Sequence, residues 1–77
     1  MDLSSTVSRA LTTVGADPAH PVDSLRTVLT RGGHFPGATR AAANLLLLHL
    51  RNGDEARAEY AARIITETPS MIVRGAA

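Results

Sequence analysis

The chain has 77 residues, which is enough for one domain and too few for two. Its basic and acidic residues nearly balance, and a formal net charge of +1 does not direct it toward phosphate backbones or anionic membranes. Cysteine is absent, so disulfides and thiolate metal sites are excluded. Because a chain this short has a small core, helix packing or self-association must supply its stability.

The sequence predicts a cytoplasmic protein. The first residues, Met1-Asp2-Leu3-Ser4, contain an acid and a hydroxyl where a secretory signal needs a basic start and an apolar run. The longest apolar run, Leu45 to Leu48, is far shorter than the ~20 residues that cross a bilayer. Every basic residue is arginine and lysine is missing, a composition typical of a high-GC bacterial genome.

Hydrophobic periodicity predicts a first helix over 3–14 and a second over 21–31. The first has Ser4 or Ser5 as its cap and Gly15 as its stop. The connector contains Pro18, and Pro21 suits the first position of the second helix. Gly32-Gly33 is expected to end that helix. The apolar residues recur at spacings of three and four, and they are Leu3, Val7, Ala10, Leu11 and Val14, then Val22, Leu25, Val28 and Leu29.

A third helix is predicted over 37–51 and a fourth over 55–67, joined by Asn52-Gly53 with Asp54 as the cap. The second half of the third helix is nearly all leucine, and a helix apolar nearly all round is central in its fold or covered by a partner. The fourth is expected to pair Glu59 with Arg63, to end at Pro69 and to leave a docking apolar tail over 70–74. Its predicted buried residues are Ala56, Tyr60, Ala61, Ile64, Ile65 and Thr68.

The short connections make consecutive helices antiparallel neighbours. We therefore predict an all-α fold, with about four short helices in two antiparallel hairpins that form a single domain over residues 1–77.

Residues 42–69 resemble one tetratricopeptide-type helical hairpin. Small and leucine-like residues in the first helix, a Gly-Asp turn, an alanine with an aromatic four residues later, and a closing proline carry the resemblance. They are Ala42, Leu45, Leu46, Gly53, Asp54, Ala56, Tyr60 and Pro69. The sequence departs from the pattern at His49, where an aromatic is common, and at Arg63, where a small residue is expected. The resemblance implies a role in binding a protein or peptide.

Three motifs point weakly to other chemistry. Asp23-Ser24-Leu25 is similar to the tripeptide around the modified serine of acyl carrier proteins, although a first helical turn explains it equally well. The segment 32–39 has the glycine spacing of a phosphate-binding loop, but Ala38 replaces its lysine. The histidines His20, His34 and His49 lack short metal-ligand spacing. We therefore predict no catalytic, cofactor or metal site, and no enzyme activity.

A basic stripe is a further possibility, formed by Arg26, Arg31, Arg40 and Arg51. Without aromatic residues for base stacking, a solvated face is the simpler interpretation. Nucleic-acid binding is therefore not expected.

The sequence thus favours a helical protein-interaction module that self-associates through helix 37–51, as a dimer. The predicted contact surface consists of Leu45, Leu46, Leu47, Leu48, Leu50, Tyr60 and Ile64. The alternative is a small regulatory protein that acts on transcription by binding DNA or a regulator. A carrier-like accessory with Ser24 modified is a third interpretation.

Overall fold

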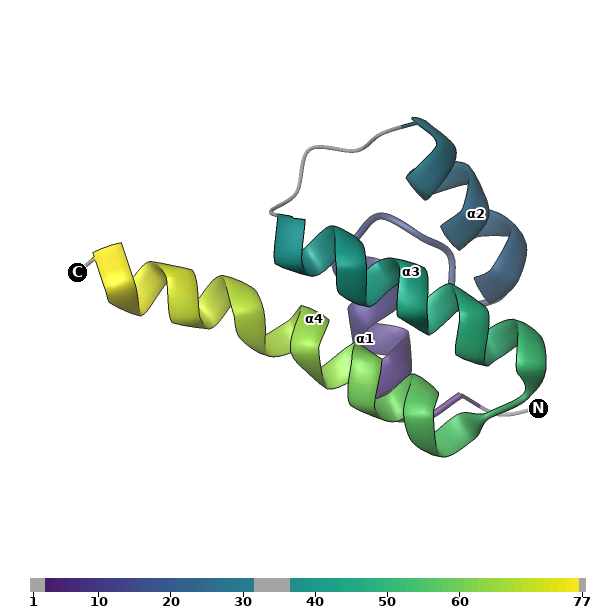
Figure 1. The fold of residues 1–77 in the computed structure, drawn as a ribbon. Coiled ribbons are helices and arrows are strands. Elements are labelled where there is room, and N and C mark those ends of the chain that lie inside the picture. Colours follow the sequence, from purple (N-terminus) through teal and green to yellow (C-terminus); the bar gives the residue numbers. More distant parts are fainter. Residues whose placement is uncertain (1–2, 32–36, 77) are drawn as a thin grey trace.

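The computed structural model describes the backbone of residues 3–31 and 37–76, and the side chains within these ranges as far as Glu67. These residues form four α-helices and no strand, namely α1 (Ser5–Thr13), α2 (Pro21–Arg31), α3 (Gly37–Asn52) and α4 (Glu55–Ala76). Figure 1 shows α3 and α4 side by side, with α1 behind them and α2 beside α3. The predicted all-α fold of four helices is confirmed.

The first three helices begin and end within two residues of their predicted bounds. The predicted end of the fourth helix is wrong, because α4 continues through Pro69 to Ala76. A proline inside a helix removes one hydrogen bond and costs about 3 kcal/mol, which weakens a helix without forbidding its continuation. The predicted docking of the apolar tail lies outside the described side chains.

The turn between α3 and α4 is fixed by Gly53 and Asp54. Gly53 has a φ of +72°, and Gly15, which follows α1, has a similar φ of +86°. Beyond Gly53, the backbone N–H of Asp54 donates to the carbonyl of His49 at 2.9 Å, as in a Schellman motif. The Asp54 carboxylate then accepts from the backbone N–H of Arg57 at 3.1 Å and caps α4. The predicted turn and cap are confirmed.

The α3–α4 hairpin is the centre of the fold, because these two helices share the largest helix–helix contact. Helix α1 packs on α4, and α2 packs on α3. In the described part of the chain, α1 and α2 have no comparable contact with each other, so they do not form a packed hairpin as the sequence predicts. The connector after α1 buries Val14 and Ala16, and it carries the chain across to the α3 side.

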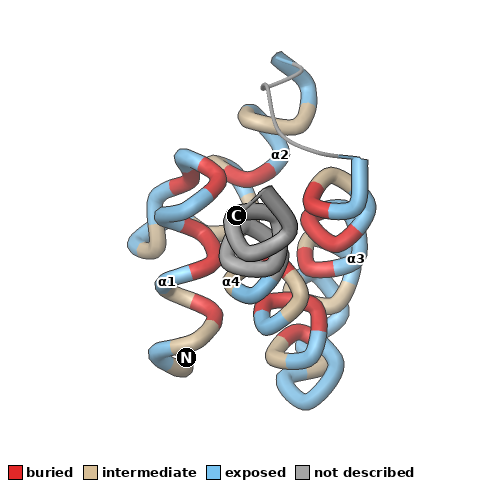
Figure 2. Tube along the Cα trace, turned by 90° about the vertical axis from the view of Figure 1, so that its left-hand side faces the viewer, coloured by how far each residue is buried: buried red, intermediate tan, exposed pale blue. Residues whose placement is uncertain are grey.

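The core is small and rich in alanine. Figure 2 shows α1 and α3 on opposite sides of α4, with their buried segments turned inward. Small side chains let helices approach closely, but they bury little apolar area, so the hydrophobic free energy of this core is limited. The buried hydrophobic residues are Val7, Ala10, Leu11, Val14, Ala16, Leu25, Ala42, Ala43, Leu46, Ala58, Ala61, Ala62 and Ile65.

Helix α4 is rotated relative to its predicted orientation. Ala61 and Ile65 are buried as predicted, but Ala56 and Tyr60 are exposed and Ala58 is buried instead. The core takes the residues at spacings of three and four from Ala58, which are Ala61, Ala62 and Ile65. The predicted burial of Thr68 lies outside the described side chains.

The predicted Glu59–Arg63 pair does not form. Arg63 instead lies 3.9 Å from the Glu67 carboxylate, with both side chains more than half exposed. Exposed pairs of this kind contribute little to stability. Across residues 3–31 and 37–76, none of the helices combines the length and hydropathy that a bilayer crossing requires.

Candidate functional site

The exposed side of the α3–α4 hairpin carries large apolar side chains. Leu45 and Leu48 are three residues apart on α3, so they share one face of that helix, and they are 47% and 48% exposed. On α4, Tyr60 is 69% exposed and Ile64, four residues later, is half-buried. We call these four residues, Leu45, Leu48, Tyr60 and Ile64, the outer face.

The outer face lies on the side of the hairpin away from α1. The core-facing line of α3 runs through Ala42, Ala43 and Leu46, so Leu48 points roughly opposite to it. On α4 the core-facing line runs through Ala58 and Ile65, and Tyr60 lies opposite in the same way. Because α3 and α4 share the largest helix–helix contact, both exposed stripes belong to the same hairpin.

The seven residues predicted for the contact surface fall into three groups. Leu46 is fully buried in the core, so its placement on the surface is corrected. Leu47, Leu50 and Ile64 are partly buried against the core. Only Leu45, Leu48 and Tyr60 expose large apolar surface. The leucine run therefore divides between core and surface with the helical period, because one helix cannot bury all its faces against three short neighbours.

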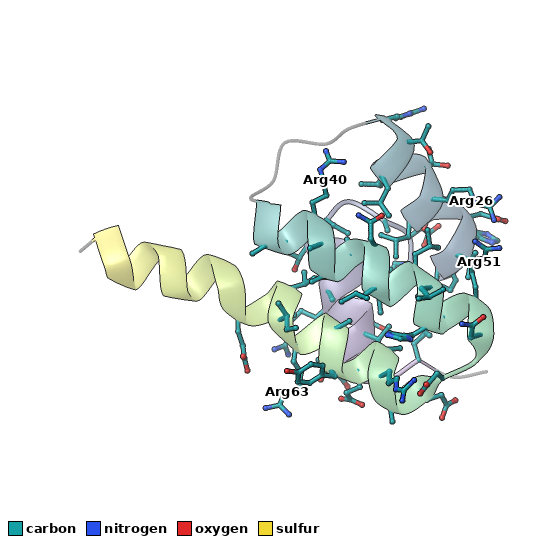
Figure 3. All side chains as sticks on the ribbon, viewed as in Figure 1. Arg26, Arg40, Arg51 and Arg63 are labelled. Carbon is teal, nitrogen blue, oxygen red and sulfur yellow. The ribbon has the colours of Figure 1, made fainter. Side chains whose placement is uncertain are left out.

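Arginine side chains border the outer face. Figure 3 shows Arg26 of α2 and Arg51 of α3 at the same end of the molecule, with Arg40 at the other end of α3 on the same side. Arg63 lies along the opposite edge of the hairpin. Helix α3 contains no acidic residue in its sixteen positions, and α2 contains only Asp23. The α2–α3 edge of the apolar face is thus bordered mainly by positive charge, whereas α4 also contains Glu55, Glu59 and Glu67.

A cleft of about 170 Å³ lies between the start of α1 and the turn that joins α3 to α4. Its apolar wall includes Leu3, Val7 and Leu50, and its rim includes His49 and Glu59. The sequence does not predict this cleft, since it joins the start of α1 to the α3–α4 turn and no local spacing signals that contact. A cleft of this size is smaller than the ~300–1,000 Å³ of typical ligand sites.

The three histidines do not form one site in the described structure. His20 is exposed in the connector, His49 lines the cleft, and His34 lies outside the described residues. Among described residues, no three His, Asp or Glu side chains gather as metal ligands would. The glycine-rich segment 32–36 also lies outside the description.

Ser24 lies in the first turn of α2 and forms hydrogen bonds with the connector between α1 and α2. Its hydroxyl oxygen accepts from the backbone N–H of Asp17 at 2.8 Å and lies 2.6 Å from the His20 carbonyl oxygen, to which it can donate. The Asp17 carboxylate accepts from the N–H of Ala19 at 2.9 Å in the same loop. These bonds give Ser24 a structural role in holding the loop, as expected for a polar residue near a helix start.

The functional interpretation rests on this geometry alone. The resemblance of residues 42–69 to a tetratricopeptide hairpin stays a prediction, and Ala56 and Tyr60 of that pattern are exposed in this chain. The most developed surface feature is the outer face with its arginine border. No protein-family model matches the chain, and comparisons with curated proteins and with solved structures give no significant match.

Proposed function

We propose that the chain is a non-catalytic helical protein-interaction module that uses the outer face to bind protein, including a second copy of itself. It would act in the cytoplasm of a bacterial cell. The observation that carries the proposal is the half-exposure of Leu45 and Leu48 on a helix whose other face forms the core. Contiguous exposed apolar side chains on a small domain are typical of contact surfaces.

Self-association would relieve two weaknesses together. The alanine-rich core supplies limited stability, and the outer face leaves leucine and tyrosine surface in water. A two-fold dimer would bury the same patch on both copies and add the apolar area that the monomer lacks.

Sedimentation equilibrium of the full chain from micromolar to millimolar concentration tests this proposal. We expect a reversible monomer–dimer equilibrium that Leu48→Glu abolishes, because the substitution places a carboxylate in the centre of the contact. Ser5→Glu is the matched control. It adds the same charge at the exposed first position of α1, where an acid is favourable, and should leave the equilibrium unchanged.

Circular dichroism would establish that Leu48→Glu remains folded, as expected for a half-exposed position. A wild-type chain that stays monomeric over the whole concentration range contradicts self-association. A dimer that Leu48→Glu does not weaken would place the contact elsewhere and contradict the role of the outer face.

A further inference from the structure

The charges around the outer face are arranged unevenly. Helix α3 has Arg40 and Arg51 and no acid, and Arg26 of α2 lies at the same end as Arg51. The acidic residues of the hairpin are on the α4 side, where Asp54 pairs with Arg57, Glu67 pairs with Arg63, and the helix also contains Glu55 and Glu59. The α2–α3 side therefore presents positive charge beside exposed leucine.

Arg26 and Arg51 are exposed and have no carboxylate partner among the described residues. Arg51 follows Leu48 by three positions, so its guanidinium lies on the next turn beside the leucine stripe. A partner that covers Leu45 and Leu48 would thus bring its own edge against these arginines.

A second copy is a poor electrostatic match for this surface. A two-fold interface that pairs the α2–α3 edge with itself would bring one arginine border against another, whereas an acidic helix meets no such repulsion. Like charges that meet across an interface lower its affinity, whereas opposite charges favour both encounter and correct register. The homodimer is therefore expected to be weak and displaceable.

We infer that the preferred occupant of the outer face is an amphipathic helix of another protein, with an apolar stripe flanked by aspartate or glutamate. Its apolar residues, spaced three and four apart, would cover Leu45, Leu48 and Tyr60. Its carboxylates would lie along the α2–α3 edge against Arg51 and Arg26. This inference rests on the proposed function, since it uses the same face.

Duplex DNA would also be attracted to arginine, but the exposed leucines favour protein. Half-exposed Leu45 and Leu48 lie beside the arginines and would gain little from a phosphate backbone. Tyr60, the exposed aromatic among the described residues, is on α4, whereas Arg26 is on α2. DNA binding is therefore an outcome that would overturn the inference.

The test is fluorescence anisotropy of the full chain with a labelled synthetic helix about four turns long. The probe has leucines at spacings of three and four and glutamates on both flanks. A matched probe has lysine at every glutamate position, and a random-sequence duplex DNA is the third ligand. We expect the acidic helix to bind at least about 10-fold more tightly than the lysine helix, less so at high salt.

Variants of the chain separate the charge contribution from the apolar one. Arg51→Glu should weaken binding of the acidic helix by about 5-fold or more and strengthen binding of the lysine helix. Leu48→Glu should remove binding of both. Arg9→Glu, a charge reversal at an exposed position of α1, should change neither.

Equal binding of the two helices, no response to Arg51→Glu, or tighter binding of DNA would overturn the inference. The sedimentation experiment tests self-association independently of the choice of partner. A dimer sensitive to Leu48→Glu, together with no preference for the acidic helix, would contradict only the choice of partner. If the chain neither forms such a dimer nor prefers the acidic helix, the proposed function is contradicted as well.

Discussion

At the scale of single residues, Gly53 has a backbone conformation that other residues rarely adopt. Its φ is +72°, and a Cβ built there would meet nothing within 4 Å. Steric crowding with neighbours is therefore not the reason for glycine at this position. The reason is the left-handed conformation that the turn between α3 and α4 requires.

Gly53→Ala should lower the free energy of unfolding by about 1 kcal/mol, the cost of placing a Cβ in the left-handed region. Gly37→Ala is the matched control, because that position is also open but has no positive φ. The control should leave stability unchanged or raise it by up to about 0.5 kcal/mol. Urea unfolding followed by circular dichroism measures both, and equal effects would contradict the conformational explanation.

Thr39 is buried, and the described structure shows no contact that offsets the cost of burying its hydroxyl group. It is 2% exposed, and within the described structure its hydroxyl oxygen has no hydrogen-bond partner. An unpaired buried hydroxyl costs about 1–3 kcal/mol. Nothing in the structure explains why threonine stands there.

At the scale of elements, α3 has two roles. One face of the helix forms part of the core, and another contributes to the outer face. Thr39, Ala42, Ala43 and Leu46 face the core, whereas Leu45 and Leu48 remain at the surface. Leu46 and Leu48 therefore have the same chemistry and the same helix but different surroundings.

Leu46→Ala should lower the free energy of unfolding by about 2–5 kcal/mol, because it removes buried area and leaves a cavity. Leu48→Ala should cost less than about 1 kcal/mol in a dilute, monomeric sample, since the side chain is 48% exposed. Thermal or urea unfolding of both variants checks the difference. Similar losses from the two substitutions would contradict the assigned rotation of α3.

At the scale of the whole molecule, packing and not charge holds the fold together. The ion pairs among the described residues are Asp54–Arg57 and Arg63–Glu67. In each pair at least one side chain is well exposed. Such pairs are screened by salt and contribute little even without it. Arg26 and Arg51, which have no carboxylate partner among the described residues, are therefore available for a partner.

Raising sodium chloride should consequently change the free energy of unfolding by less than about 0.5 kcal/mol. Urea is the appropriate denaturant here, because guanidinium is itself a salt. The same increase in salt should clearly weaken binding of the acidic helix, so the two measurements form a pair. A large salt dependence of stability would indicate a charge network that the described contacts do not include.

The helices, their caps and their turns were predictable because they depend on local features. The Ser4 cap, Gly15, the Pro21 start and the Gly53-Asp54 turn each act within a few residues. The end of α4 was not predictable in this way, because a proline opposes a helix by an amount that the rest of the helix can offset.

The sequence by itself determined an all-α chain, the bounds of its first three helices and the apolar surplus of α3. Only the tertiary structure decided which leucines form the core, since Leu46 and Leu48 look alike in sequence and differ in the helix face they occupy. It also decided that α1 packs on α4 and α2 on α3, and that Arg26 lies near Arg51. Contacts between distant segments depend on how helices rotate and dock, and that geometry is set by the whole core at once.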